Sequence, residues 1–176
     1  MDREHHEEWR RLERRALDVL RKGIGLEEIG VRRILQVVET PSFRPASSWE
    51  IFEQNSRSAP VGHFAVCLRW RYDLDSEKFK TPLERLKHPR TIEPTMETHR
   101  VELKTAFVTE ARSRLRKIAV PAYTEAETVG CDGTGYELAF GDAFLGARFT
   151  WWEIPPTPLQ TLAEESRRIL RELAAL

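Results

Sequence analysis

Two short runs near the end of the chain, CDGTGYELAFG at residues 131–141 and ARFTWWE at residues 147–153, decide the fold. The glycines at the start of the first run permit a tight turn, because glycine accepts backbone conformations that other residues avoid. Gly141 and Gly146 bracket the segment between the two runs, as they would in a hairpin. We therefore predict strands over 136–140 and 147–153 that are joined by a hairpin turn.

A helix is expected to close the chain after Pro155-Pro156. Thr157 is a natural N-cap, Pro158 suits the first helical position, and Gln160 completes a capping box. The side chains that recur at helical spacing and are expected to face the sheet are those of Leu159, Leu162, Ser166, Ile169, Leu170 and Leu173.

The clearest strand upstream covers residues 61–72. Its side chains alternate, with Phe64 and Val66 on one side and His63 and Cys67 on the other. A period of two that separates apolar from more polar residues is typical of an antiparallel sheet with one solvated face. We therefore predict a sheet that is covered on one face and wetter on the other.

The remaining segments are assigned from helical spacing, β-branched runs and the positions of proline, glycine and serine. We predict helices over 2–22 and from Thr95 or Thr98 to 118, and a further helical turn within 25–30. Strands are predicted over 33–39 and 49–53, with a loop over 40–48. Residues 73–94 are predicted to form a long polar connection with one turn of helix near 83–86. No repeat or linker divides the chain. The prediction is a single α+β domain over 1–176, with an antiparallel sheet covered by helices; whether the N-terminal helix over 1–22 packs on that domain stays open.

The composition limits the classes of protein to consider. The 176 residues carry 28 Lys and Arg against 28 Asp and Glu, so the net charge is zero and there is no general nucleic-acid footprint. The longest apolar run, residues 64–68, is far shorter than the roughly 20 residues that span a bilayer. Residues 1–22 lack the apolar centre of a signal peptide, and two isolated cysteines give no disulfide framework. We expect a bacterial, cytoplasmic protein that binds neither nucleic acid nor membranes.

Charge is distributed unevenly along the chain. Residues 61–120 hold 13 Lys and Arg against 8 Asp and Glu, whereas residues 121–176 hold 4 against 9. The acidic C-terminal third could attract a basic partner, although such asymmetry is also an ordinary property of solvated surface. Both interpretations stay open.

No metal or cofactor is expected. In the run His5-His6-Glu7-Glu8, adjacent histidines on a helix point about 100° apart and cannot chelate a metal from one face. The other histidines stand alone, without the spacing of known metal motifs. The run DGTG at 132–135 lacks the spacing of a phosphate-binding loop and precedes a strand, so we interpret it as a turn.

A candidate anion site consists of His63, Arg69 and Arg71 on the predicted strand over 61–72. The arginines could equally bind an acidic partner or be ordinary exposed strand residues. Cys67 lies beside them, and neighbouring arginines can lower the pKa of a thiol. His63 is four residues from Cys67, roughly 13 Å along a strand, which is too far for it to act as a base. A structural role for Cys67 is favoured.

A candidate protein-binding surface lies on the last predicted strand. Trp151 and Trp152 place one indole on each face of that strand. One is expected in the core, while the other either packs under the terminal helix or is exposed. An exposed indole beside acidic residues would be an anchor for a partner. The candidate partner-binding residues are Trp151, Trp152, Glu153, Asp142 and Glu137.

The order DGTGYEL at 132–138, WWEIPP at 151–156 and a leucine-rich terminal helix resembles that of small bacterial proteins of uncharacterised function. Some of these resemble immunity proteins, which neutralise secreted toxins. The resemblance covers mainly residues 131–176, with a looser echo in ETPSF at 39–43, and it transfers no functional residues. It implies a non-enzymatic binding protein, in one form an inhibitor that blocks a toxin domain by occlusion.

Three hypotheses of function follow. The first is a cofactor-free protein-binding module, with the immunity type as its specific form. The second is an enzyme whose site is not contiguous in sequence, built near His63, Arg69 and Arg71 with Tyr136-Glu137. The third is a structural or regulatory subunit that oligomerises through the narrow apolar stripe of the helix over 2–22.

Overall fold

The computed structural model describes residues 3–25, 30–42, 44–55, 61–88, 92–121, 133–141 and 146–176. The helices are α1 (Arg3–Lys22), α2 (Tyr72–Glu77), α3 (Pro82–Leu86), α4 (Thr105–Arg116) and α5 (Gln160–Ala174), and a 3-10 turn, η1, over Thr157–Leu159 leads into α5. The strands are β1 (Val31–Pro41), β2 (Ser47–Gln54), β3 (Gly62–Trp70), β4 (Met96–Leu103), β5 (Thr134–Gly141) and β6 (Gly146–Trp152).

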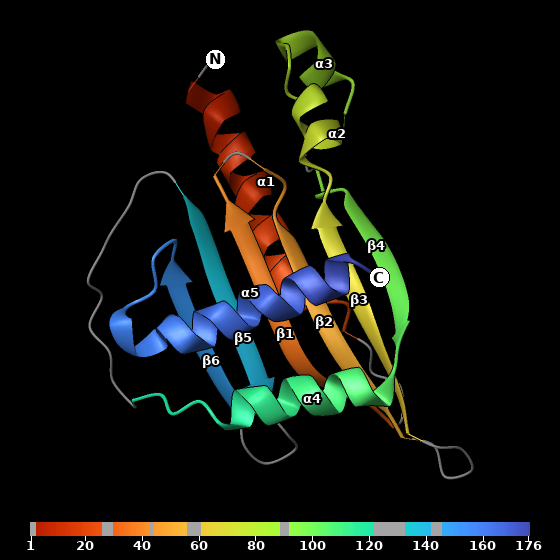
Figure 1. The fold of residues 1–176 in the computed structure, drawn as a ribbon. Helices are drawn as coiled ribbons and strands as arrows, with labels where there is room; N and C mark the ends of the chain where they lie inside the picture. Colours follow the sequence, from red (N-terminus) through yellow and green to blue (C-terminus); the bar gives the residue numbers. More distant parts are fainter. Residues whose placement is uncertain are drawn as a thin grey trace.

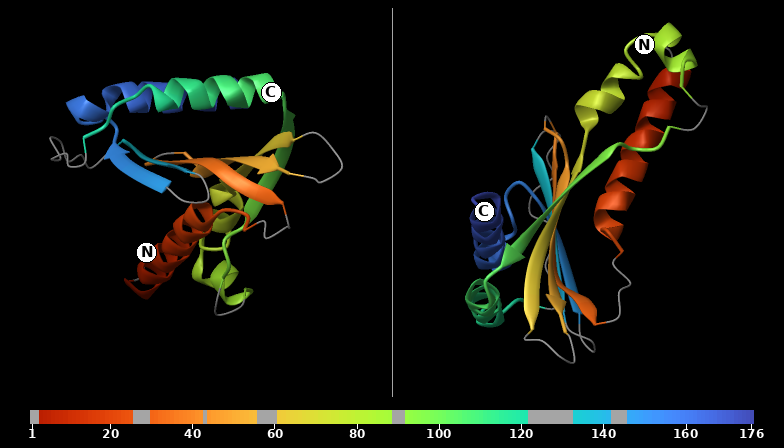
Figure 2. Two further views of the ribbon diagram at one scale, coloured as in Figure 1. Left: turned by 90° about the horizontal axis from the view of Figure 1, so that it is seen from below. Right: turned by 90° about the vertical axis from the view of Figure 1, so that its right-hand side faces the viewer.

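These strands form one sheet in the order β4-β3-β2-β1-β5-β6, and every neighbouring pair is antiparallel. The helices α4 and α5 lie across one face of the sheet, and α1 lies across the other (Figure 1, Figure 2). The predicted α+β fold, with an antiparallel sheet covered by helices and a hairpin followed by a terminal helix, is confirmed.

The larger apolar core lies between the sheet and the pair α4 and α5. Burial of these faces removes apolar surface from water, which is the main favourable term in folding. All of the positions in η1 and α5 that were predicted to face the sheet are buried. The residues at the centre of this core include Val37, Ile51, Ala65 and Leu138 from the sheet, and Val108, Ala111, Leu162, Ile169 and Leu173 from the helices.

On the opposite face, α1 packs against the sheet with the apolar stripe that the sequence predicts. Leu12, Ala16 and Leu20 are at most 2% exposed and contact side chains of the sheet and its connections. The open question about this helix is therefore answered, since α1 is part of the domain. The stripe is already buried, so it offers no surface for the oligomerisation proposed in the third hypothesis.

Polar side chains of the sheet donate hydrogen bonds to the carbonyl groups in the last turn of α1. The final carbonyl groups of a helix have no partner within the helix and must find one elsewhere. Gln36 Nε2 donates to the carbonyl of Leu20 at 2.8 Å, and Arg33 Nη1 donates to the carbonyl of Lys22 at 3.1 Å. Arg33 also donates to the fully buried Glu50 at 2.6 Å, which compensates the carboxylate charge. These contacts fix the end of α1 on β1 and β2.

The prediction of a wetter face for the strand over 61–72 is wrong. Both faces of β3 are covered: Phe64 and Val66 pack in the α1 layer, while His63, Ala65 and Cys67 are at most 6% exposed on the other side. The polar character of His63 suggested solvent. Its ring instead lies 3.4 Å from the Thr105 hydroxyl at the start of α4, so the helix supplies a polar neighbour that water would otherwise provide.

The prediction of one helix from Thr95 or Thr98 to 118 is also wrong in its first half. Met96–Leu103 is the edge strand β4, and only Thr105–Arg116 is helical. Seven of the eight β4 side chains are at least partly exposed, so the strand carries little apolar period of its own. Pairing with the long strand β3 decides its conformation, because strand preference depends mainly on tertiary context.

The C-terminal hairpin is confirmed by the pairing of β5 with β6, although its turn over 142–145 lies outside the described residues. The predicted capping box is wrong. Thr157 lies inside η1, and neither η1 nor α5 has a side-chain cap in the described residues. An N-cap residue needs a non-helical backbone conformation. Thr157 does not have one, because it is the first residue of the 3-10 turn.

Several predicted boundaries change. The strands over 33–39 and 49–53 extend to Val31–Pro41 and Ser47–Gln54, which shortens the loop between them. The strand predicted to reach residue 72 ends at Trp70. The helical turn near 83–86 is confirmed as α3, whereas α2 was not predicted. The turn predicted within 25–30 falls largely on 26–29, outside the described residues.

Candidate functional site

The two adjacent tryptophans lie on opposite faces of β6, as the strand period predicts. Trp151 pairs across the sheet with Tyr136 and stacks on its ring with centroids 5.6 Å apart. It is 6% exposed in the core under α5 and is therefore not a surface anchor. Trp152 faces the other side, pairs with Gly135, and is half-buried.

The acidic residues proposed beside these indoles are mostly compensated within the protein. Glu137 is buried and pairs with Arg21 of α1 at 3.1 Å and with Arg148 of β6 at 3.2 Å. A carboxylate of Glu153 accepts from the backbone N–H of Thr134 at 2.8 Å. Asp142 lies outside the described residues. The described members of the predicted partner surface therefore do not gather into one exposed acidic patch.

The three residues of the predicted anion site are not brought together. His63 is buried near the start of β3, 3.8 Å from Glu53, whereas Arg69 lies six residues further along the strand, roughly 20 Å away. Arg71 follows the strand and makes a bidentate pair with Asp73, at 2.9 and 2.7 Å. The three residues lie in different surroundings, so they do not form a common site.

A pocket of about 380 Å³ near Arg69 was missed by sequence reasoning. It lies between the β3–β4 edge and the C-terminal end of α5, and Cys67 faces it directly opposite His99 of β4. The prediction of a helix through His99 concealed this pairing. Burial raises the pKa of the Cys67 thiol, an effect that Arg69 partly offsets. A protonated thiol is a weak nucleophile, which fits the structural role predicted for Cys67.

The most distinctive feature of the surface is a helical arm, which we define as residues 72–88 with α2 and α3. The arm extends past the end of β3 and lies beside the N-terminal half of α1, beyond the ends of the strands (Figure 1, Figure 2). Thr81 begins α3, because its hydroxyl accepts from the N–H of Glu84 at 3.1 Å. The arm therefore has defined local structure.

Aromatic rings hold the base of the arm against α1. Trp9 of α1 stacks on Trp70 with centroids 5.7 Å apart and meets Tyr72 and Phe79 edge to face at 5.2 and 5.3 Å. Such pairs add to the free energy of burial by roughly 0.5–1.5 kcal/mol each. Arg85 of α3 adds a bidentate pair with Glu8 of α1, at 2.7 and 3.0 Å.

Asp75 organises the polar side of the same base and is completely buried. One carboxylate oxygen accepts from Trp70 Nε1 and from the N–H of Thr95, both at 2.8 Å. The other accepts from the Thr95 hydroxyl at 2.6 Å and from Lys78 Nζ at 2.5 Å. Burial would raise the pKa of Asp75, but the hydrogen bonds from Lys78, Thr95 and Trp70 outweigh it and lower the pKa. The arm is thus fixed to β3 and to the chain before β4.

The arm exposes large apolar side chains. Leu83 and Leu86 of α3 are 73% and 80% exposed, and Tyr72 and Leu74 of α2 are both 44% exposed. Leu83 and Leu86 are three residues apart and share one side of their helical turn. Single exposed leucines are common, but four large apolar side chains on one short element indicate an interaction surface.

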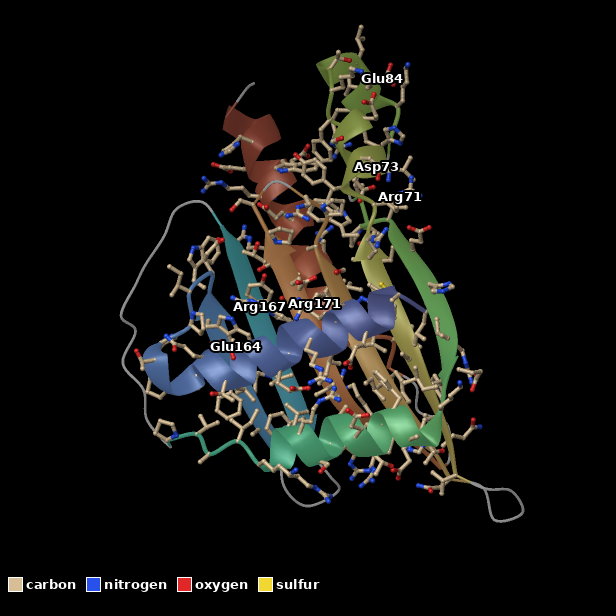
Figure 3. All side chains as sticks on the ribbon, in the orientation of Figure 1. Arg71, Asp73, Glu84, Glu164, Arg167 and Arg171 are labelled. Carbon is tan, nitrogen blue, oxygen red and sulfur yellow. The ribbon has the colours of Figure 1, made fainter. Side chains whose placement is uncertain are left out.

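Charges on the arm are neutralised locally. Figure 3 shows Asp73 and Glu84 on the arm and Arg71 directly before it. The pair with Arg71 lowers the pKa of the Asp73 carboxyl to about 2, and the pair with Lys87 lowers the pKa of Glu84. Lys80 pairs with Glu77, Lys78 pairs with Asp75, and Arg85 pairs with Glu8 of α1. The leucines are therefore set in a surface of balanced charge.

No protein-family model, curated protein or solved structure matches the chain. The resemblance of residues 131–176 to immunity-like proteins therefore stays a prediction. Within the described residues, no helix is long and apolar enough to cross a membrane. In the same part of the chain, no three His, Cys, Asp or Glu side chains gather in a way that could hold a metal ion.

Proposed function

We propose that the chain is a non-enzymatic protein-binding module and that the tip of the helical arm is its docking surface. The observation that carries this proposal is the 73% and 80% exposure of Leu83 and Leu86 on an element whose base is fixed by buried contacts. A surface that is already ordered loses little conformational entropy when it binds. Its partner is a folded protein with an apolar recess that receives these two side chains.

The balanced charge of the arm bears on how the partner is recognised. Because Asp73, Glu77 and Glu84 each have a basic neighbour, the arm carries no strong field that would attract one sign of charge. Affinity would come mainly from apolar contact at the centre of the interface. Binding should therefore depend weakly on salt, in contrast to capture of a basic partner by the acidic C-terminal third.

The specific form of this proposal is an immunity-type inhibitor that occludes a toxin domain in the bacterial cytoplasm. It rests on the resemblance of residues 131–176. The product of the neighbouring gene is the first partner to test. A complex between the two proteins would support this form, and the absence of a complex would remove it.

The experiment compares three proteins co-expressed with that gene product: the wild type, the double variant Leu83→Glu with Leu86→Glu, and the control Ile154→Glu. Ile154 is 64% exposed and follows β6, which is at the opposite edge of the sheet from β3 and β4, the strands that the arm connects. We expect complexes with the wild type and the control, and none with the double variant, by size-exclusion chromatography with light scattering. A complex that survives the double variant would place the interface elsewhere.

If the neighbouring gene product does not bind, a photo-crosslinking amino acid at position 86 tests the wider proposal in the source organism. The same amino acid at position 154 is the control. A discrete adduct specific to position 86 should be reproduced with the purified partner and abolished by Leu83→Glu with Leu86→Glu. Crosslinking that is equal at both positions, or absent from both, contradicts docking through the arm.

A second candidate function is an enzyme that uses the pocket beside Arg69, Cys67 and His99. The observation in its favour is that Cys67 and His99 are directly opposite each other on β3 and β4. The raised pKa of Cys67 is against it, since the thiolate is the reactive form. Alkylation of Cys67 by iodoacetamide at neutral pH tests this alternative: reaction faster than that of free cysteine would support it, and slow reaction would dispose of it.

A further inference from the structure

The helix α4 lies at the other end of the molecule from the helical arm (Figure 1). A second concave site is lined by residues of the C-terminal half of this helix. This cavity of about 250 Å³ is open on one side and lies between α4 and the ends of β1, β5 and β6. Its walls are mainly apolar, with Ile51, Leu115 and Phe140 among them. Protein interiors are usually close-packed, so an apolar space of this size within the core layer requires an explanation.

Small residues create the space. Ala111 of α4 faces the sheet at 3% exposure, and across the cavity the hairpin supplies Gly141, Gly146 and Ala147. Larger side chains at these positions would fill the gap. The cavity exceeds the roughly 150 Å³ of an engineered apolar cavity that binds a six-carbon ring, and it approaches the roughly 300 Å³ of small ligand pockets. By the same scaling, an alkyl chain of about ten carbons would fill it.

Two guanidinium groups line the cavity, and they differ in their partners. Arg112 donates to Glu53 at 3.2 Å, and Glu53 also accepts from Arg32 at 2.9 Å. Arg116, one helical turn later, is exposed and has no side-chain hydrogen bond or ion pair within the described residues. An unpaired guanidinium beside an apolar space matches a ligand with an anionic head and an apolar tail.

We propose that this cavity binds a linear alkyl carboxylate, with the chain between α4 and the sheet and the carboxylate paired with Arg116. The geometry of the guanidinium suits bidentate pairing with a carboxylate. Each methylene transferred from water should tighten binding roughly fourfold until the cavity is full. This ligand site is independent of the proposed docking through the arm, and either can fail without the other.

The test titrates the full chain with hexanoate, octanoate and decanoate below their micelle concentrations, by isothermal calorimetry. We expect saturable binding of one decanoate, with affinity that falls roughly tenfold or more for octanoate and further for hexanoate. Decanol and decyltrimethylammonium, which keep the chain and change the head, should bind at least about tenfold more weakly. Decanoate binding that is absent, or no tighter than decanol binding, overturns the proposal.

Variants separate the head from the tail. Arg116→Glu should remove the preference for decanoate over decanol, while Lys117→Glu, a change of the same charge at the next, exposed residue, should keep it. Ala147→Phe on the edge strand should fill the cavity and abolish binding of both ligands; Ala111→Phe repeats this from the helix side. Full decanoate affinity in Arg116→Glu, or in a folded cavity-filling variant, contradicts the assignment.

Discussion

The helical arm and the C-terminal hairpin with α5 use similar residues with opposite results. Both are rich in leucine and aromatic side chains, but Trp151 and Leu162 are buried while Leu83 and Leu86 are exposed. The difference is what lies beneath each element. α5 crosses the broad apolar face of the sheet, whereas the arm extends past the end of β3, where the sheet offers no surface (Figure 1). Exposure is therefore decided by the available neighbour and not by composition.

The two regions also differ in what fixes them. The C-terminal module is held mainly by apolar burial, with ion pairs from Arg114 of α4 to Glu165 and Glu172 of α5. Trp151 Nε1 has no hydrogen-bond partner within the described residues. The base of the arm combines aromatic contacts with one buried carboxylate, and Trp70 Nε1 donates to Asp75. An apolar contact weakens gradually when it is trimmed, whereas a buried polar network leaves unpaired groups when one member is lost. Four predictions test this contrast, from the largest expected effect to the smallest.

Trp151→Ala should lower the free energy of unfolding by about 3–5 kcal/mol, because it opens a cavity under α5 and removes the stacking on Tyr136. Trp152→Ala is the matched control on the opposite face. Its side chain is less buried than that of Trp151, so a smaller loss is expected. Urea unfolding of both variants gives the comparison, and equal losses would contradict the difference in burial.

Asp75→Asn should destabilise the protein by about 3 kcal/mol, because an amide N–H₂ would face either the Trp70 and Thr95 donors or the Lys78 ammonium. Asp73→Asn, two residues earlier in the same helix, is the control. Asp73 is exposed, so its loss should change thermal stability little despite its pair with Arg71. Similar melting temperatures for the two variants would show that Asp75 does not fix the arm.

Acid should loosen the arm locally. The lowered pKa of Asp75 means that its charged form is favoured in the fold, so its contribution to stability is complete above about pH 4 and is lost as the pH falls through the lowered pKa. The Trp70 indole N–H resonance should therefore shift below about pH 4 in NMR titration. The Trp151 indole, which meets no carboxylate within the described residues, is the internal reference. A Trp70 shift retained in Asp75→Asn would contradict this cause.

Leu86→Glu should leave the free energy of unfolding within about 0.5 kcal/mol of the wild type, because the side chain is 80% exposed and packs on little of the protein. Leu83 is 73% exposed, so the double variant Leu83→Glu with Leu86→Glu, which should abolish partner binding, is also expected to stay folded. Differential scanning calorimetry checks this. A large loss of stability would mean that the leucines support the arm itself and are not available for docking.

The parts of the fold that were predicted correctly are those with a strong local period. The α1 stripe of Leu12, Ala16 and Leu20, the inward face of α5 and the strands of the C-terminal hairpin all follow from side-chain spacing. The failures share a cause. β4 has a weak period because seven of its eight side chains, on both faces of the strand, are at least partly exposed. Thr157 does not cap α5 because the chain enters that helix through a 3-10 turn.

The candidate sites were less predictable than the fold. The three residues of the predicted anion site, His63, Arg69 and Arg71, are close in sequence. An extended strand nevertheless holds His63 far from the two arginines, so the side chains meet different neighbours. The pairing of Cys67 with His99 depended on a strand that was interpreted as a helix. The only sequence signal for the exposed leucines of α3 is the presence of two apolar residues in a polar segment that contains several prolines.

The sequence by itself determined the fold class, because apolar side chains that recur every 2 residues indicate strands and those that recur every 3.6 residues indicate amphipathic helices. It also determined that Trp151 and Trp152 lie on opposite faces. Only the tertiary structure decided which indole is buried, that both faces of β3 are covered, and that the arm ends beyond the sheet. Burial is a property of the space between elements, and local sequence does not specify what occupies that space.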